Sequence, residues 1–315
     1  MKLALVFPGQ GSQRPGMGKA LAAAYPAARR VFEEVDDALN QKLSKLIFDG
    51  AEIDLRRTEN TQPALMTVGM AVLRVLADEG GAAPGSYSLV AGHSLGEYSA
   101  LAAAGAFTIA DAARVLRARG LAMQKAVPGD AGVMSAVLGA ELAAVEKAAA
   151  DAADLTGGVC VVANDNAPGQ VVLSGNTTAV EAAEVGVKAA GAKRAVRLEV
   201  AAAFHSPLMQ PAAAEMKRVL AEVAVRTPAV PVVANVTAGQ ASDPNDIREL
   251  LVRQITGRVR WRECVTHIAA QGVDTLLELG AGKVLAGLAK RIEPGLTTYS
   301  VETPEDVAAF LTMVR

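Results

Sequence analysis

The chain has 315 residues, of which 51% are hydrophobic and 20% are charged, and its formal net charge is −2. This apolar content supports a full core and argues against a disordered chain. There is no basic excess for nucleic acid, no apolar run near the ~18 residues of a membrane span, and too short an apolar N-terminus for a signal peptide. We therefore expect a cytoplasmic protein. The sequence does not determine its oligomeric state, and a monomer is one possibility.

The first part of the chain alternates apolar runs with helical patterns. Residues 3–7 ("LALVF") predict a buried strand, and helical patterns follow over residues 18–46 and 62–79. Residues 87–94 ("YSLVAGHS") predict a second buried strand with a helix after it. Strands that alternate with helices indicate an α/β protein with a mainly parallel sheet covered on both faces.

The middle of the chain has a different order. Strand-like and helix-like segments follow one another as β-α-β-β-α-β, the ferredoxin-like unit, over residues 132–139, 141–152, 159–166, 169–176, 178–191 and 193–200. We therefore predict an inserted ferredoxin-like subdomain at residues 130–198. The larger catalytic domain then consists of residues 1–129 and 199–315.

Ser94 lies in "GHSLG", a G-x-S-x-G pentapeptide between the second strand and its helix. In a nucleophile elbow, glycines permit a sharp turn that lifts the serine above the sheet edge, next to a helix N-terminus. The pentapeptide alone is a weak signal, but the strand before it and the helix after it are the context that an elbow requires. A plain tight turn remains the alternative reading.

A serine nucleophile needs a base, and the chain has three histidines. His93 adjoins Ser94, where neighbouring side chains on a turn diverge, and His267 lies in a helical pattern. His205 lies in a loop between a strand and a helix, so it is the candidate base by elimination. An ordinary hydrogen-bonded loop histidine is the alternative. No acidic partner is evident, but a backbone carbonyl can orient the ring equally well.

Arg119 is anomalous on a helical wheel of residues 110–127. It falls in the apolar stripe formed by residues 112, 115, 116, 123 and 126, whereas Arg114, Arg117 and Lys125 fall on the opposite face. A buried arginine needs an anionic partner, because unpaired burial is costly. A bidentate clamp on a substrate carboxylate is one reading. A structural ion pair or a snorkelling side chain is the other.

Other motifs predict less. The glycine-rich "FPGQGSQRPGMG" matches neither G-x-G-x-x-G nor a P-loop, which leaves backbone N–H donation, as in an oxyanion hole. Cys160 and Cys264 lack metal-ligand spacing, and no pair of histidines is spaced to bind a metal, so no metal site is predicted.

Several segments together resemble one family. "FPGQGSQ", "GHSLGEYSAL", "RGLAMQ", "FHSPLM" and "VRQITGRVRW" are similar, in this order, to the landmarks of malonyl-CoA:acyl carrier protein transacylases of fatty acid synthesis. The acyltransferase domains of polyketide synthases share most of these landmarks. The resemblance covers nearly the whole chain and implies an α/β-hydrolase-like core with a ferredoxin-like insertion.

The resemblance also implies catalytic roles. Ser94 would carry the acyl group as an ester, and His205 would act as general base and later as general acid. Gln254 would orient His205 through its backbone carbonyl. The N–H groups of Gln10 and Leu95 would form the oxyanion hole.

Substrate-binding roles follow in the same way. Arg119 would hold the malonyl carboxylate, in line with its place on the helical wheel. Phe204, His93 and Asn164 would also contact the substrate, and the Phe204 ring would crowd a 2-methyl group.

The implied reaction is ping-pong transfer of malonyl from malonyl-CoA to the phosphopantetheine thiol of acyl carrier protein, with no bound cofactor. Basic residues that could dock this acidic, transient partner are Lys193, Arg194, Lys290 and Arg291. Three alternatives remain: a serine thioesterase or hydrolase, a catalytically silent module, and a stand-alone acyltransferase of a polyketide pathway.

Overall fold

The computed structural model describes residues 1–82, 85–126, 132–200 and 202–314. Its larger sheet has six strands in the order β10-β9-β1-β2-β7-β8. All neighbouring pairs are parallel except β7–β8. The strands are β1 (Leu3–Phe7), β2 (Tyr87–Gly92), β7 (Val232–Val233), β8 (Gln240–Ala241), β9 (Thr275–Leu279) and β10 (Thr297–Val301).

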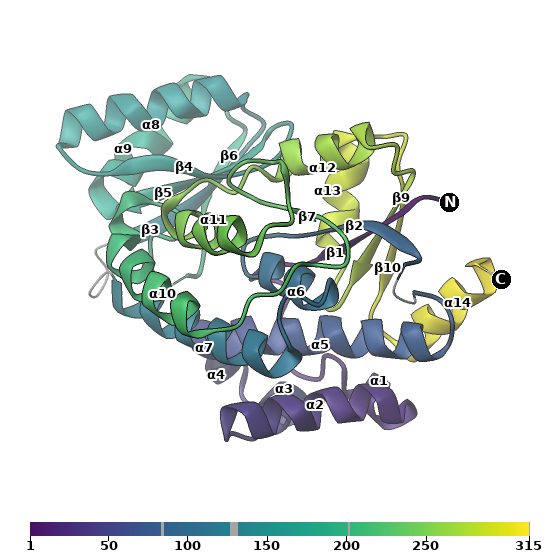
Figure 1. Ribbon diagram of the computed structural model, residues 1–315. Helices are drawn as coiled ribbons and strands as arrows, with labels where there is room; N and C mark the ends of the chain where they lie inside the picture. Colours follow the sequence, from purple (N-terminus) through teal and green to yellow (C-terminus); the bar gives the residue numbers. More distant parts are fainter. Residues whose placement is uncertain (83–84, 127–131, 201, 315) are drawn as a thin grey trace.

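Helices cover both faces of this sheet, as Figure 1 shows. On one face Leu5 and Phe7 of β1 pack in a large core with α5, α6 and α7, whereas Ala4 and Val6 pack on the other face with α12 and α13. Every residue of β1 is therefore buried, as expected for a parallel strand between two helical layers. The helices of this part are α1 (Lys19–Ala24), α2 (Pro26–Leu39), α3 (Leu43–Asp49), α4 (Glu52–Leu55), α5 (Thr58–Asp78), α6 (Gly96–Ala103), α7 (Ile109–Ala126), η2 (Pro207–Met209), α10 (Gln210–Glu222), α11 (Pro244–Thr256), α12 (Trp261–Ala270), α13 (Val284–Ile292) and α14 (Pro304–Val314).

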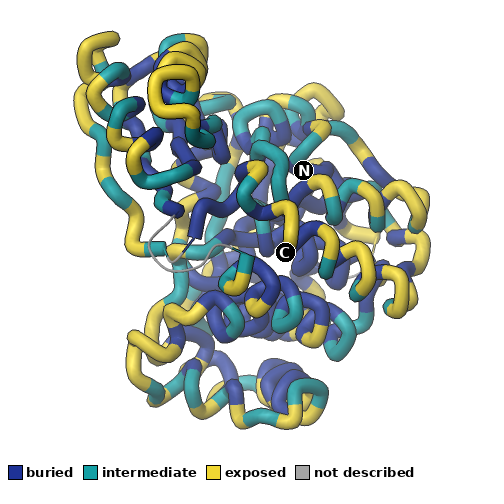
Figure 2. Tube along the Cα trace, turned by 90° about the vertical axis from the view of Figure 1, so that its left-hand side faces the viewer, coloured by how far each residue is buried: buried dark blue, intermediate teal, exposed yellow. Residues whose placement is uncertain are grey.

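A second, antiparallel sheet stands apart from the first, in the teal region of Figure 1. Its strand order is β4-β5-β3-β6, and its own apolar core lies between the sheet and two helices. Exposed residues gather on the outer surface of this region (Figure 2). Its elements are β3 (Gly132–Leu138), α8 (Leu142–Thr156), β4 (Cys160–Ala167), β5 (Gln170–Asn176), α9 (Thr177–Ala189) and β6 (Arg194–Arg197).

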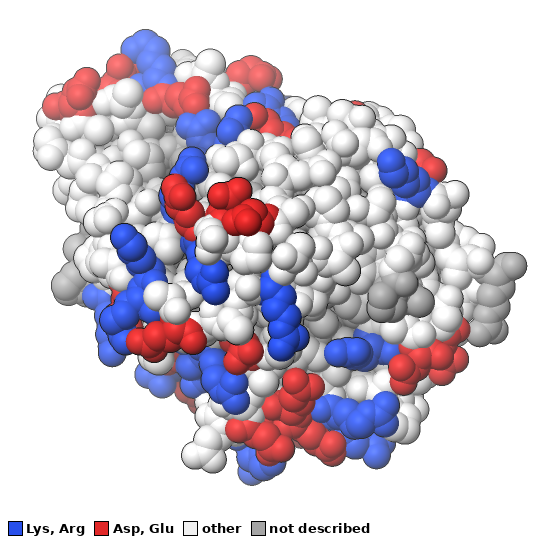
Figure 3. All heavy atoms as spheres, viewed as in Figure 1, with Lys and Arg blue, Asp and Glu red and all other residues white. Residues whose placement is uncertain are grey.

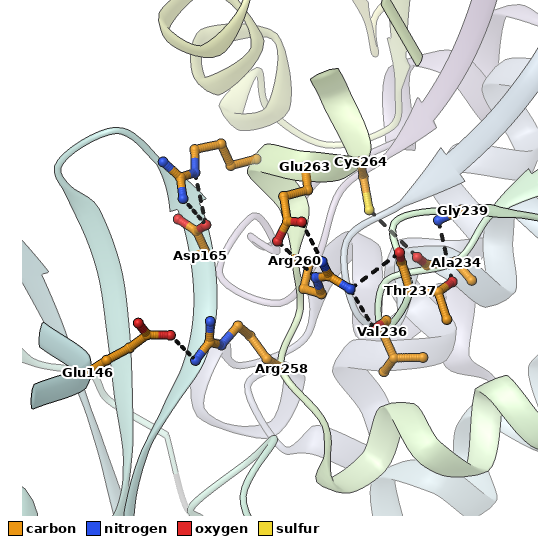
Figure 4. A network of polar contacts seen from close by, with 11 residues as sticks. Glu146, Asp165, Ala234, Val236, Thr237, Gly239, Arg258, Arg260, Glu263 and Cys264 are labelled. Atoms are coloured by element: carbon orange, nitrogen blue, oxygen red, sulfur yellow. Dashed lines mark hydrogen bonds and ion pairs between the residues drawn. The ribbon is translucent and has the colours of Figure 1, made fainter. Parts of the chain in front are cut away.

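The segment before α12 joins the two sheets (Figure 4). Val259 exchanges two backbone hydrogen bonds of 2.8 and 2.9 Å with β4. Arg258 pairs with Glu146 of α8 at 2.7 Å, and Arg262 pairs with the buried Asp165 of β4 at 2.8 Å. Backbone hydrogen bonds and two ion pairs therefore contribute to holding the second sheet against the first.

The predicted fold class is confirmed: the protein is α/β, with a mainly parallel sheet and a separate antiparallel sheet. The β-α-β-β-α-β order also occurs as expected. The division into domains at 130 and 198 stays a prediction, and its first boundary lies outside the described residues. No helix in the described ranges is long and apolar enough to cross a membrane.

One predicted helix boundary was wrong, and the helical patterns over residues 18–46 form three helices. Tyr25, before Pro26, is extended and separates the first two, and Asn40, with φ 47°, ends the second. The helix expected from residue 62 begins instead at Thr58. Pro63 therefore lies inside the helix and not in its first turn, where proline is usually found.

Candidate active site

Ser94 lies at the tip of a sharp turn between β2 and α6. Its φ is 53°, in the left-handed region that non-glycine residues rarely adopt. The flanking glycines are required by space: a Cβ on Gly92 would lie 1.9 Å from the backbone oxygen of Gly96, and one on Gly96 would lie 2.2 Å from that of Phe7. The turn therefore brings the serine to the carboxyl ends of the parallel strands, at the N-terminus of a helix.

His205 precedes η2 and reaches Ser94 from the other side. Its Nε2 lies 2.7 Å from Ser94 Oγ, and its Nδ1 lies 2.8 Å from the backbone oxygen of Gln254. A carbonyl can only accept, so Nδ1 carries the proton and Nε2 is left free to accept one. Burial, together with the charge of Arg119, lowers the pKa of His205 to about 3, so the ring is neutral at physiological pH.

Arg119 of α7 is 1% exposed and lies beside this pair. Its Nη2 donates to Ser94 Oγ at 3.1 Å and to Gln254 Oε1 at 2.8 Å, and its Nη1 donates to Gln62 Oε1 at 2.8 Å. Its Cζ lies 5.4 Å from the centre of the Tyr98 ring, a cation–π distance. Burial lowers the pKa of Arg119, but a guanidinium stays protonated in proteins. Within the described ranges, Arg119 forms no ion pair with a carboxylate.

The remaining basic side chains of α7 mostly face away, as the helical wheel predicted. Arg114 and Lys125 are exposed. Arg117 differs from its prediction, because it is half-buried and donates to the side chain of Gln41. The ring of His93 also points away from the serine as expected, since its Nε2 lies 2.8 Å from Asn166 Oδ1.

These residues surround one cavity of about 300 Å³. Gln254 lies behind its wall and is fully buried. The apolar part of the wall includes Met123, Met134, Leu198 and Val200, which the sequence analysis did not single out. The cavity brings together all the other predicted site residues: Gln10, His93, Ser94, Leu95, Arg119, Asn164, Phe204 and His205.

Two backbone N–H groups at the cavity are candidates to donate hydrogen bonds to a substrate. Among the hydrogen bonds of the described residues, neither the Gln10 nor the Leu95 N–H donates to a protein acceptor. Leu95 also caps α6, so the partial positive charge of the helix N-terminus adds to its N–H. Both residues line the cavity together with Ser94. No cluster of three or more potential metal ligands occurs in the part of the chain that the structure describes.

Sequence reasoning missed three polar residues that contact the site. Gln62 binds Arg119. Asn235 accepts a hydrogen bond from the Ser94 N–H at 2.8 Å, and Glu97 accepts one from Gln254. The available signal was a polar residue among buried helix positions, as for Gln62 in α5, or a polar residue shortly after a strand, as for Asn235 two residues after β7. Neither position forms a motif.

The geometry suits a serine enzyme that transfers an acyl group with a second, anionic end. The family described as "acyl transferase domain" matches residues 4–294. The malonyl CoA-acyl carrier protein transacylase of Bacillus subtilis (strain 168) is 46% identical over 306 residues, which cover 97% of this chain and 95% of that protein.

Two solved structures have the same fold at TM-scores of 0.96. The acyl-carrier-protein-S-malonyltransferase from Bartonella henselae is 52% identical, and the match covers 100% of this chain and 99% of that one. A malonyl-transacylase in complex with its type II PKS acyl-carrier protein is 42% identical, with 99% and 100% covered. The chain belongs to the acyl transferase domain family, and within it to the malonyl CoA-acyl carrier protein transacylases.

Proposed function

We propose that the protein transfers the malonyl group from malonyl-CoA to the phosphopantetheine thiol of an acyl carrier protein, by a ping-pong reaction through an ester on Ser94. The observation that carries this proposal is Arg119, a buried cation without a carboxylate partner among the described residues, whose Nη2 lies 3.1 Å from Ser94 Oγ. A substrate that places a carboxylate beside the reacting carbonyl would neutralise it. Malonyl carries its carboxylate one carbon from the thioester.

In the first half-reaction, His205 Nε2 takes the Ser94 proton while Oγ attacks the thioester carbonyl. The C–S bond then breaks, and the CoA sulfur takes the proton from His205. In the second half-reaction the carrier-protein thiol gives its proton to His205 and attacks the ester carbonyl. The ester C–O bond then breaks, and Ser94 Oγ takes the proton back from His205. Both halves pass through a tetrahedral oxyanion, which the N–H groups of Gln10 and Leu95 would stabilise by about 3 kcal/mol each.

Arg119 would act in specificity as well as in binding. An acetyl group would leave the buried guanidinium without a direct ion-pair partner, which penalises that substrate. Phe204, buried in the cavity wall, would crowd a 2-methyl group and so favour malonyl over methylmalonyl. His93 and Asn164, also in the wall, would contact the acyl group or its thioester arm.

The partner, an acyl carrier protein, is acidic, and docking would use Lys193, Arg194, Lys290 and Arg291. All four are exposed. On the face drawn in Figure 3, basic and acidic side chains are interspersed and no single large basic patch stands out.

The proposed chemistry requires no bound cofactor, because malonyl-CoA brings an activated thioester and the carrier protein brings the accepting thiol. A cytoplasmic location is also part of the proposal. The two cysteines are free and buried, as is usual for proteins of reducing compartments. The complex with a type II PKS acyl-carrier protein favours one second candidate, the same transfer in service of a polyketide pathway.

Release of CoA and of free malonate tests the proposal against hydrolysis. The protein is mixed with excess malonyl-CoA, with and without holo acyl carrier protein. A transferase releases about one CoA per enzyme without the carrier protein, and forms malonyl-carrier protein when it is added. Continuous release of free malonate without carrier protein would show a hydrolase, and no CoA release in either case would show a silent module.

A further inference from the structure

Glu97 is a buried carboxylate directly beneath the elbow. It belongs to the first turn of α6, three residues after Ser94, and is 2% exposed. One of its oxygens, Oε2, accepts hydrogen bonds from the Asn235 N–H at 2.9 Å and from Gln254 Nε2 at 2.8 Å. Since a buried charge is costly, its place here calls for a reason beyond packing.

The two partners of Glu97 hold the backbone of Ser94 on both sides. Asn235 Oδ1 accepts from the Ser94 N–H at 2.8 Å, and Gln254 Nε2 donates to the Ser94 carbonyl at 3.0 Å. Asn235 is fixed further by donating from Nδ2 to the Gly92 carbonyl at 2.8 Å. The left-handed φ of Ser94 is a strained conformation, so it persists only if several contacts hold the residue in place. Glu97 accepts a hydrogen bond from each of the two residues that hold the Ser94 backbone, Asn235 and Gln254.

Glu97 and Arg119 fit the same orientation of the Gln254 amide. Arg119 can only donate, so it requires the amide oxygen, and it receives Oε1 at 2.8 Å. An ionised carboxylate can only accept, so Glu97 requires the amide nitrogen. The orientation of Gln254 thus joins Glu97 to Arg119. The backbone oxygen of the same residue holds His205.

The electrostatics near Glu97 are simple. Burial raises its pKa to about 7, against the hydrogen bonds from Asn235 and Gln254 and the charge of Arg119. The other titratable groups facing it are Tyr98 on its own helix and Cys264 on α12. Burial raises the pKa of both, so both are neutral near pH 7. Arg119 and, as the pH rises above about 7, the Glu97 carboxylate are therefore the two charges that interact there.

We propose that Glu97 is a positioning residue for acyl transfer: its ionised carboxylate orients Asn235 and Gln254, which in turn hold the Ser94 backbone and the Arg119 guanidinium. The inference rests on the proposed function, because it concerns the same reaction. Loss of the charge should slow ester formation on Ser94 for every acyl group. It should slow malonyl more than acetyl, because only malonyl uses Arg119.

Glu97→Gln is the test variant, because one amide oxygen can replace Oε2 and accept both hydrogen bonds without the charge. The measurement is single-turnover CoA release from malonyl-CoA and acetyl-CoA, without carrier protein. Its second-order rate constant equals kcat/KM for that CoA thioester in a ping-pong reaction. Malonyl kcat/KM should fall roughly tenfold, the difference between hydrogen bonds to charged and to neutral acceptors. Acetyl kcat/KM should fall less, so the malonyl-to-acetyl ratio should drop.

Glu278→Gln is the matched control. Glu278 of β9, in the parallel sheet, is fully buried, and burial raises its pKa as it raises that of Glu97. It accepts from the N–H groups of Leu285 and Ala286 at the start of α13 and contacts none of the site residues. Its variant carries the same loss of a buried charge, and should leave both rates and their ratio unchanged.

The pH profile separates positioning from a structural role. Malonyl kcat/KM of the wild type should fall as pH decreases through about 7, where Glu97 gains a proton. His205, with a pKa near 3, stays neutral over this range and produces no such fall. Glu97→Gln should show a flat profile at the low-pH level of the wild type. An unchanged malonyl kcat/KM in Glu97→Gln would overturn the inference. A reduced kcat/KM that keeps the wild-type pH profile and the wild-type malonyl-to-acetyl ratio would overturn it as well. No CoA release from the wild type would instead overturn the proposed function.

Discussion

A network of buried polar side chains lies at one edge of the parallel sheet, whereas the core between the antiparallel sheet and its helices is built on aliphatic residues. At the carboxyl ends of the parallel strands, polar side chains lie in the interior and bind one another, among them Arg119, Glu97 and Gln254. The antiparallel sheet instead buries an apolar core, with residues such as Val137 and Leu173 fully enclosed. The parallel sheet thus carries the reactive groups, and the second sheet forms a wall beside them.

The difference follows from strand geometry. Parallel strands all end at one edge, so residues far apart in sequence meet there, and helix N-termini gather at the same edge. Each strand of an antiparallel sheet runs opposite to its neighbour, so its ends offer no such convergence. Met134 and Asn164 are the second sheet's contribution to the cavity, and both lie in its wall. Changes in the first sheet should therefore alter chemistry, and changes in the second should alter stability or substrate fit.

The largest effect is expected from His205→Ala. Without the base, malonyl transfer should fall by about 10³-fold or more, since the Ser94 hydroxyl keeps its proton. Steady-state transfer assays measure the loss, with circular dichroism to check folding. His267→Ala is the control, because His267 lies in α12 outside the cavity and should leave the rate unchanged. Equal rates for both variants would remove His205 from the mechanism.

Arg119→Ala should have the next largest effect. Malonyl transfer should fall about 10²-fold or more, the cost of removing one partner from a buried ion pair with substrate. Acetyl transfer should gain relative to malonyl, because the unpaired cation is gone. Competition between the two CoA thioesters measures the preference. Arg114→Ala, on the exposed face of the same helix, should retain the wild-type preference. An unchanged preference in Arg119→Ala would contradict the carboxylate clamp.

In the second sheet, Leu173→Ala should reduce stability without slowing the chemistry. Leu173 is fully buried, and truncation of such a leucine costs about 2–5 kcal/mol of the free energy of unfolding. Urea denaturation measures this cost, and transfer assays well below the transition should give a wild-type kcat. A kcat reduced as strongly as in His205→Ala or Arg119→Ala would contradict the claim that the second sheet affects stability and not chemistry.

The smallest effect is expected from Arg258→Ala at the junction of the sheets. Arg258 and Glu146 have side chains 31% and 43% exposed, so their pair should contribute at most about 1 kcal/mol. Arg262→Ala should cost more, because it leaves the 1% exposed Asp165 without its partner. Thermal denaturation of the two variants compares them. A larger loss of stability in Arg258→Ala than in Arg262→Ala would show that the exposure of an ion pair does not determine how much it stabilises this junction.

The sequence predicted the fold class and the residues that carry a local signal. Ser94 has its pentapeptide, and Arg119 interrupts an apolar stripe. Gln254 has no local signal and came from family resemblance alone. Glu97, Asn235 and Gln62 were missed because each acts through hydrogen bonds to residues distant in sequence, which periodicity does not reveal. The start of α5 was misplaced because tertiary packing keeps Pro63 inside a helix.

The central claim is that a malonyl ester forms on Ser94. Intact-protein mass spectrometry after brief mixing with malonyl-CoA tests it directly, for the wild type and for Ser94→Ala. The account predicts one malonyl increment on the wild type, lost on addition of acyl carrier protein, and none on the variant. An increment of equal size on Ser94→Ala, or none on a wild type that still forms malonyl-carrier protein, would contradict it.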